Sequence, residues 1–495
     1  MMMLMTILRR WRLAWGSALL LASVGAGAQI LPGGGGGLPG GGGLPSSGPS
    51  MPSTGGTSSL PGTSGLPGTS GLPGVGDVGD SVSRIGSDVR GAMDPATGRL
   101  NPLVATPGQL AEARSLRLSD QVRRYPDQLE MTDFGPAVRG QVIALDPDPA
   151  ALDAALDAGF RRIAEERIEG LDIRSVTLGV PRGWSINRAL SRLRRIAPGG
   201  QFSANNLHEP AGALTSSMGS AAMTQRTRAA PPRRGRAAPP RRVPAAPTPP
   251  RPPVAPPPTI GIIDGGVVAH PSLRGAMQQR GFVAGAPRAS LHGTAVASLI
   301  AGQGPVRGAA PGIRLLVADI YGADPAGGNA LALTRALGWM VSQGVRVVAV
   351  SLVGAPNPLV QRAIQQARAR GTWVVAAVGN DGRAAPPAFP ASYPGVIAVT
   401  GVDGRGRVLI EAGRSLHLDY AAPGADMGAA GPRGNVVAVR GTSFAVPLVA
   451  GRLAQHLRAA NVLASLDTEA AQGRGVGRGV LCGNCRTPLS TASRR

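Results

Sequence analysis

The clearest pattern begins near residue 259, where apolar, β-rich runs alternate with helical segments. Five short runs rich in Val, Ile and Ala predict strands at residues 259–263, 314–320, 346–352, 372–378 and 395–399. Helices are predicted at residues 294–301, 330–343, 358–370 and 443–458. Nearly continuous apolar strands separated by helices are typical of a parallel sheet covered on both faces. We therefore expect an α/β three-layer sandwich with functional residues beyond the carboxyl ends of the strands.

A second, smaller pattern occupies residues 116–210. Strands are predicted at residues 138–145, 176–180 and 201–207. Asp148 and Ser185 each provide a start signal for a helix between these strands. The first helix is expected to bury one apolar face, formed by Leu152, Leu156, Phe160 and Ile163. The β-α-β-α-β order predicts a small α+β domain.

Low-complexity segments separate these regions. Residues 29–115 form a predicted disordered spacer, in which Leu-Pro-Gly-Thr-Ser-Gly repeats and only a short helix near Leu110 is expected. Residues 211–258 are rich in Ala, Pro and Arg and predict an extended linker. The catalytic candidate therefore spans 259–460, followed by a tail at 461–495.

The amino terminus has the pattern of an export signal. Arg9, Arg10 and Arg12 precede an apolar stretch that ends in small residues at Ala28. This order predicts a signal peptide over residues 1–28, with secretion to the periplasm or the cell exterior. An uncleaved membrane anchor is the alternative.

The charge is strongly positive, with a formal net value of +23. Arg residues crowd into the proline-rich stretch from Arg226 to Arg251. Such a segment can contact anionic polymers non-specifically, or it can be a solvated linker. Aromatic residues make up only 3% of the chain, so the stacking platform of a specific nucleic-acid site is not expected.

The two cysteines, Cys482 and Cys485, form a single C-x-x-C pair. A structural metal site usually needs two further ligands. In an exported protein we expect a local disulfide or an unpaired feature of the tail. No cofactor and no metal are expected, because no Asp-rich loop suitable for calcium is present.

Three short segments carry candidate chemistry. Asp264 ends an apolar strand, His292 opens a helix, and Ser443 begins another helix within Gly-Thr-Ser-Phe-Ala-Val-Pro. A serine hydroxyl becomes an effective nucleophile when a neutral histidine takes its proton. A buried carboxylate fixes the histidine tautomer and stabilises the imidazolium. The three residues therefore predict a catalytic triad.

The oxyanion of such a reaction needs hydrogen-bond donors. Asn380 follows the predicted strand at 372–378, so its amide can point into the same site. Together with the backbone N–H of Ser443, it would complete an oxyanion hole.

These segments resemble the subtilisin-like serine protease family. The order Asp, His, Ser matches the subtilisin order, and the segment around Ser443 fits the family's Gly-Thr-Ser-x-Ala-x-Pro motif. Val378-Gly379-Asn380 resembles the family's oxyanion segment. The resemblance covers residues 259–460 and implies a secreted serine endopeptidase acting on proteins or peptides through an acyl-enzyme.

By the same resemblance, four residues would form the strand that pairs with the substrate: Ser351, Leu352, Val353 and Gly354. Two departures from the family stand out. Gly265 follows the aspartate where Ser or Thr is usual, and Val353 replaces a usual Gly. The second departure implies narrowed substrate pockets.

Residues 116–210 resemble a family propeptide, which implies an intramolecular partner that covers the cleft and a zymogen that cleaves itself within 205–258. Two alternatives remain open. One is a catalytically inactive binding module with the subtilisin fold, and the other is an Arg-rich tether to anionic polymers.

Overall fold

The computed structural model describes residues 101, 105–211, 213–214 and 258–489, all within the compact unit Pro73–Arg495. The predicted signal peptide, nearly all of the predicted spacer and most of the Arg-rich linker lie outside these residues. Among the helices of the described ranges, none has the length and apolar character needed to cross a membrane.

A seven-stranded parallel sheet forms the centre of the larger domain, in the order β15-β14-β13-β11-β8-β10-β9. Its strands are β8 (Thr259–Asp264), β9 (Met277–Gly281), β10 (Arg314–Asp319), β11 (Val347–Val350), β13 (Trp373–Ala377), β14 (Ile397–Val402) and β15 (Tyr420–Pro423). The expected parallel sheet is confirmed. Sequence reasoning missed β9 and β15 because neither has a long apolar run.

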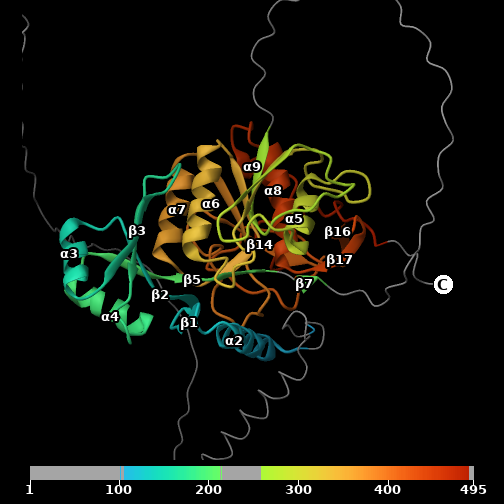
Figure 1. Ribbon diagram of the computed structural model, residues 1–495. Coiled ribbons are helices and arrows are strands. Elements are labelled where there is room, and N and C mark those ends of the chain that lie inside the picture. The colour runs from blue at the N-terminus through green and yellow to red at the C-terminus, as the bar shows by residue number, and fades with distance from the viewer. Residues whose placement is uncertain (1–100, 102–104, 212, 215–257, 490–495) are drawn as a thin grey trace, which may run out of the picture. The chain divides into compact units, whose positions relative to one another are not determined.

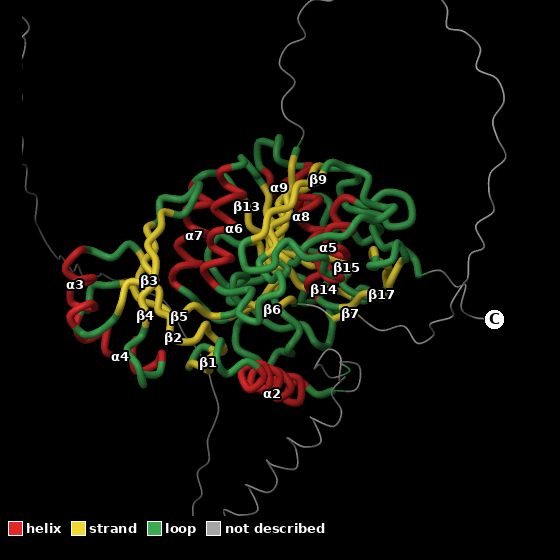
Figure 2. Tube along the Cα trace, viewed as in Figure 1, coloured by secondary structure: helices red, strands yellow, loops and turns green. Residues whose placement is uncertain are grey.

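Helices cover both faces of this sheet (Figures 1 and 2). One face packs on α5 (Leu291–Ala301) and α8 (Ala445–Gln455), and the other on α6 (Ala330–Ser342) and α7 (Pro358–Ala369). Successive side chains of β8 point to opposite faces of the sheet. Ile262 therefore belongs to the hydrophobic core on one face, and Ile263 belongs to the core on the other. This arrangement places the carboxyl ends of the strands at one edge.

The amino-terminal domain contains a five-stranded antiparallel sheet in the order β1-β2-β4-β3, with β5 also paired to β2. Its elements are β1 (Leu129–Thr132), β2 (Gly135–Leu145), α3 (Pro149–Asp157), β3 (Arg161–Arg167), β4 (Arg174–Gly179), α4 (Ile186–Ile196) and β5 (Gln201–Asn206). Helices α3 and α4 cover one face of the sheet.

The opposite face of that sheet packs on α6 and α7, since Ile143 and Ile173 share a buried cluster with both helices. Polar contacts complete this packing at the amino ends of the two helices. The Leu331 N–H of α6 donates to Asn205 Oδ1 at 3.0 Å, and Asn357 Nδ2 donates to the Ala204 carbonyl at 2.9 Å. The end of β5 is thereby fixed beside the parallel sheet.

Two expectations for the amino-terminal region were wrong. The helix after Asp148 ends at Asp157, because Gly159 turns the chain with φ +90°; Ile163 consequently lies on β3 and is 53% exposed. The short helix expected near Leu110 is instead the long α2 (Pro107–Arg124). A capping box between Thr106 and Gln109 starts it, so the disordered spacer cannot extend to residue 115.

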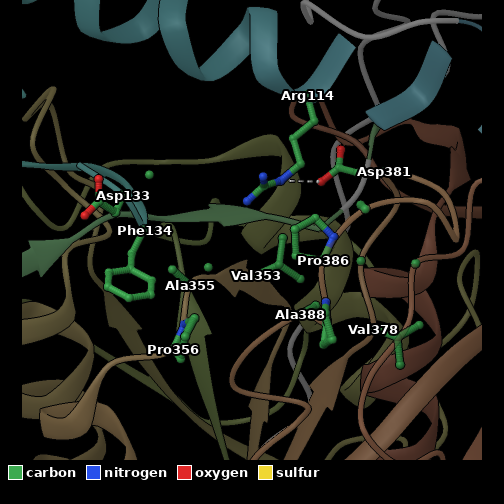
Figure 3. A pocket seen from close by; sticks show the side chains of 16 residues that line it. Arg114, Asp133, Phe134, Val353, Ala355, Pro356, Val378, Asp381, Pro386 and Ala388 are labelled. Carbon is green, nitrogen blue, oxygen red and sulfur yellow. Dashed lines mark ion pairs between the residues drawn. The ribbon is translucent and has the colours of Figure 1, made fainter. Parts of the chain in front are cut away.

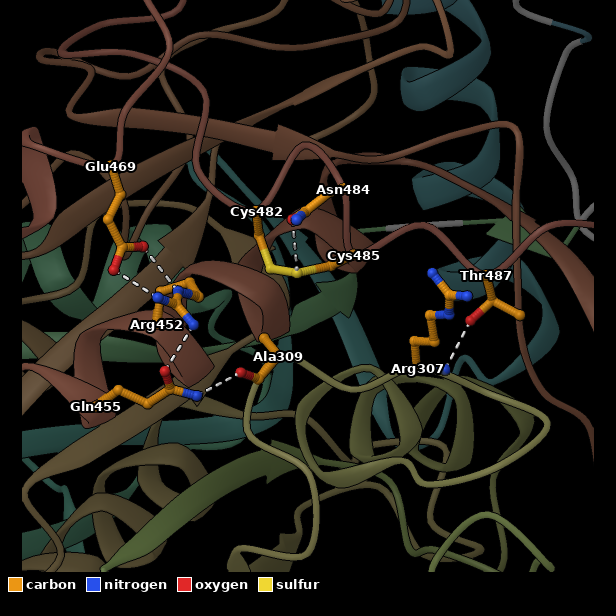
Figure 4. The surroundings of a disulfide bond; sticks show 9 residues. All are labelled: Arg307, Ala309, Arg452, Gln455, Glu469, Cys482, Asn484, Cys485 and Thr487. Atoms are coloured by element: carbon orange, nitrogen blue, oxygen red, sulfur yellow. Dashed lines mark hydrogen bonds and ion pairs between the residues drawn. A yellow bond between two sulfur atoms is a disulfide. The ribbon is translucent and has the colours of Figure 1, made fainter.

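The described part of the expected tail, residues 461–489, packs on the larger domain. Helix α9 (Val462–Asp467) starts it, and Leu481 N–H then donates to the Ala421 carbonyl of β15 at 2.8 Å. Cys482 and Cys485 form the local disulfide, one of the two expected states (Figure 4). A small sheet of β16 (Met427–Ala430), β17 (Val436–Arg440) and β7 (Ala213–Leu214) lies elsewhere on the domain.

Candidate active site

The candidate aspartate and histidine meet at the carboxyl edge of the parallel sheet. Asp264 ends β8 with no exposed surface, and His292 is the second residue of α5. His292 Nδ1 lies 2.8 Å from Asp264 Oδ2 and 3.0 Å from Oδ1. Because an ionised carboxylate only accepts, Nδ1 carries the proton of the neutral ring and Nε2 is left as an acceptor.

Ser443 occupies the other side of that ring. It lies in a short 3₁₀ turn, η1 (Thr442–Phe444), which leads into α8. His292 Nε2 is 2.9 Å from Ser443 Oγ, and the Phe444 ring packs against the imidazole with a centroid separation of 5.2 Å. The Ser hydroxyl can therefore donate to the free nitrogen of His292. All three residues are buried.

Two glycines permit this close assembly. A Cβ added to Gly293 would lie 2.2 Å from the Gly265 carbonyl oxygen, so only glycine lets α5 approach the loop after Asp264. A Cβ on Gly265 would lie 2.5 Å from Cβ of Ser290, the residue that caps α5. The departure from Ser or Thr at position 265 thus has a steric reason.

A peptide carbonyl from the chain itself occupies the space beside Ser443. The Ser443 N–H donates to the Ala211 carbonyl at 3.0 Å, and Asn380 Nδ2 donates to the same oxygen. Asn380 Oδ1 accepts from the Thr442 N–H at 2.9 Å, which orients the amide. The two donors that the sequence suggested therefore converge on one carbonyl oxygen.

The residues before Ala211 continue as an extended strand. Strand β6 (His208–Pro210) pairs antiparallel with β12 (Leu352–Gly354), and Val353 is the partner of Glu209. The Ala211 N–H donates to the Ser351 carbonyl at 2.9 Å. The strand expected at 346–352 is split, because β11 ends at Val350 and β12 leaves the sheet to pair with β6.

A cavity opens next to this strand (Figure 3). Val353, Val378 and Ala388 line its walls, and Arg114 of α2 and Asp381 lie at its edge, joined by an ion pair. Val353 faces the positive-φ turn at Gly379, where an added Cβ would be 3.4 Å from Val353 Cγ1. The valine therefore takes up space beside the turn that precedes Asn380.

Sequence reasoning missed the segment 208–211 and Arg117 as members of this site. The available signal for the segment 208–211 was the domain boundary expected at residue 210, because it placed the end of the amino-terminal domain next to the linker. The remaining histidines of the catalytic domain have structural partners; His270, for example, contacts the Asn435 carbonyl at 3.0 Å. No cluster of three or more potential metal ligands was found within the described ranges.

Comparisons with known proteins indicate the family of the chain. A family model described as the subtilase family matches residues 257–472. Subtilisin BL of Lederbergia lenta is 34% identical over 205 residues, which cover 39% of this chain and 74% of that protein. An alkaline protease of Alkalihalobacillus alcalophilus is 33% identical over 205 residues, 39% of this chain and 52% of that protein.

The crystal structure of fervidolysin from Fervidobacterium pennivorans, a keratinolytic enzyme related to subtilisin, has a TM-score of 0.54 to this chain. The likeness covers 73% of this chain and 63% of that chain at 18% identity, and it shows a shared fold. Fold and relatives define the class of the protein, a serine-type endopeptidase with a subtilisin-like fold. The chain belongs to the subtilase family.

Proposed function

We propose that Asp264, His292 and Ser443 are the catalytic triad of this endopeptidase, and that Asn380 with the Ser443 N–H forms its oxyanion hole. The observation that carries this proposal is the Ala211 carbonyl, which accepts hydrogen bonds from both donors while Ser443 Oγ contacts His292. Such donors act most strongly in a buried site, where little water competes with them.

The reaction follows from these contacts. Ser443 Oγ attacks the carbonyl carbon while His292 Nε2 takes its proton, and Asp264 stabilises the resulting imidazolium. The C–N bond of the substrate then breaks, and His292 returns the proton to the leaving amine. Water hydrolyses the ester on Ser443 with the same histidine as base. Strand β12 would hold the substrate through backbone hydrogen bonds, as it holds β6.

The protein is made, in this proposal, as a zymogen that cleaves itself after Ala211. The segment 208–211 lies in the cleft as a substrate would, and its last carbonyl is in the oxyanion hole. The amino-terminal domain presents this segment, because β5 is fixed beside α6 and α7 immediately before it. Self-cleavage was expected within residues 205–258. In this proposal, the position of the Ala211 carbonyl favours the bond between residues 211 and 212.

The test is to incubate the full chain and to measure its intact mass, its new amino terminus and its labelling by a serine-reactive phosphonate. We expect cleavage between residues 211 and 212 and a label on Ser443. Ser443→Ala should leave one unlabelled chain, since losing this nucleophile costs on the order of 10⁶ in turnover in subtilisins. Ser465→Ala, which removes a hydroxyl on α9, should behave like the wild type.

A folded wild-type chain that is neither cleaved nor labelled would overturn the triad and favour an inactive binding module. Cleavage only at another bond would overturn the role of Ala211 and leave the triad intact. Export is also proposed, from the signal pattern at residues 1–28. Fractionation of the producing cells should find the protein outside the cytoplasm with a mass lacking those residues.

A further inference from the structure

Asp381 is the charged residue that follows the oxyanion asparagine. Its side chain is 11% exposed and contacts two guanidinium groups from α2. Arg117 Nη2 lies 3.1 Å from Asp381 Oδ1. Arg114 Nε lies 3.3 Å from Asp381 Oδ2, an ion pair drawn in Figure 3. Helix α2 packs closely at this point, because a Cβ added to Gly382 would meet Leu110 Cβ at 3.2 Å. The Asp381 carboxylate at the cleft edge is therefore paired with two cations from the chain itself.

Arg117 also contacts the strand in the cleft. The same Nη2 atom lies 3.0 Å from Glu209 Oε2, and Glu209 is the third residue before the bond proposed to be cut, position P3. Burial disfavours the charged guanidinium, but the two carboxylates outweigh it and raise the pKa of Arg117 above its usual value. Arg117 thus remains a cation and bridges the strand to the protease loop.

This bridge compensates for a repulsion. Glu209 and Asp381 bond the same nitrogen, so the two bonded oxygens are within about 6 Å of each other, a range at which like charges repel strongly near a protein surface. Without Arg117, an acidic P3 side chain would face Asp381 directly. Once α2, with Arg114 and Arg117, is absent, a basic P3 side chain would instead meet the Asp381 carboxylate at that distance.

We propose that Asp381 forms a cation-binding subsite of the cleft, which selects an Arg or Lys side chain at P3 of the substrate, and that α2 masks this subsite in the unprocessed chain. The inference rests on the proposed function, because self-cleavage breaks the covalent link between α2 and the catalytic domain and so allows α2 to leave. In the unprocessed chain, Arg117 neutralises Glu209 and Asp381, so Glu209 can occupy P3. The processed enzyme lacks Arg117 and would disfavour an acidic residue at P3.

The subsite is tested with three peptides of sequence His-Xaa-Pro-Ala joined to a fluorogenic amine, in which Xaa is Arg, Gln or Glu. For the processed protein we expect kcat/KM to be about tenfold higher for Arg than for Gln, and lower again for Glu, as for a partly desolvated charge pair. Asp381→Asn should abolish this order. The control Asp403→Asn removes a carboxylate that pairs with Arg407 outside the cleft, and it should preserve the order.

Equal rates for the three peptides in the wild type would overturn the subsite, as would an Arg preference that survives in Asp381→Asn. Hydrolysis that persists in Ser443→Ala would instead contradict the proposed function. The two failures are therefore distinguishable.

Masking by α2 is tested in the full-length Ser443→Ala chain by hydrogen exchange of the β6 and β12 amides. Arg117→Ala should speed this exchange by about tenfold or more, because it removes the guanidinium that lies between the Glu209 and Asp381 carboxylates. Adding Glu209→Gln should recover most of the protection. Arg123→Ala, a change on the exposed side of the same helix, should leave exchange unchanged. Unchanged exchange in Arg117→Ala, or no recovery with Glu209→Gln, would overturn the masking.

Discussion

His208 makes the hold of β6 on the cleft dependent on pH. Its side chain is 1% exposed, and neither ring nitrogen has a hydrogen-bond partner among the described residues. Burial lowers the pKa of His208 to about 4, although backbone groups of Gly328 and Asn206 partly favour the charged ring. The bound strand therefore requires the neutral imidazole.

The direction of the effect follows from the two pKa values. In a released strand His208 regains an ordinary pKa near 6.5, so above that pH the ring is neutral in both states and β6 is held fully. As the pH falls from 6.5 towards 4, the released strand gains a proton that the bound strand does not. Release becomes easier by about 1.4 kcal/mol per pH unit in this window. Between pH 7.5 and pH 5.0 the total is about 2 kcal/mol, or about 30-fold.

The assay is hydrogen exchange of β6 and β12 in the full-length Ser443→Ala chain, corrected for the intrinsic pH dependence of exchange. Protection should fall by about 30-fold between pH 7.5 and pH 5.0. His208→Phe keeps a flat ring of similar size without a titrating group, and its protection should not change with pH. An equal loss in His208→Phe would refute the reasoning and assign the effect to carboxylates elsewhere in the chain.

Three further changes have defined outcomes. Asn380→Ala should lower kcat by about 10² to 10³ with little change in KM, measured by steady-state peptide hydrolysis, because it removes one oxyanion donor. Gly354→Ala would place a Cβ 2.5 Å from the His208 ring, so self-cleavage should slow. A dipeptide substrate has no residue at the position of His208 and should be hydrolysed normally. Cys482→Ser opens the disulfide to Cys485, and it should lower stability by about 2 kcal/mol at most, seen as a small fall in Tm, because the closed loop is short.

The sequence predicted the parallel sheet, which is confirmed, and it singled out the three residues of the proposed triad, because the signals for both are local. Asp264 is the last residue of the apolar strand β8, Asn380 lies three residues after the end of β13, and Ser443 lies within a motif that specifies its own turn. Parallel strands with short apolar runs place such residues at one edge without further information. Helix α7 was likewise recognisable from its periodicity, since it buries one apolar face.

The contacts that cross between domains were not predictable in the same way. Arg117 contacts Glu209 and Asp381, which are 92 and 264 positions away in the chain. The helical pattern of α2 gives its apolar face but no indication of which carboxylates it meets. The split between β11 and β12 was missed for a related reason, since β12 pairs with a strand from another domain. The exposed Ile163 shows the converse error, in which an apolar residue was assigned to a helix face that Gly159 had already ended.

The two devices that hold β6 act on opposite sides of the strand. Successive side chains of a strand point in opposite directions, so His208 faces the backbone at Gly354 while Glu209 reaches Arg117. The His208 ring packs on Gly354 and the Glu209 carboxylate bonds Arg117, so we expect the two free energies to add. An Arg117→Ala chain at pH 5.0 should therefore lose protection by about the product of the separate factors, roughly 300-fold relative to the wild type at pH 7.5. A much smaller combined loss would mean that one change already releases the whole strand.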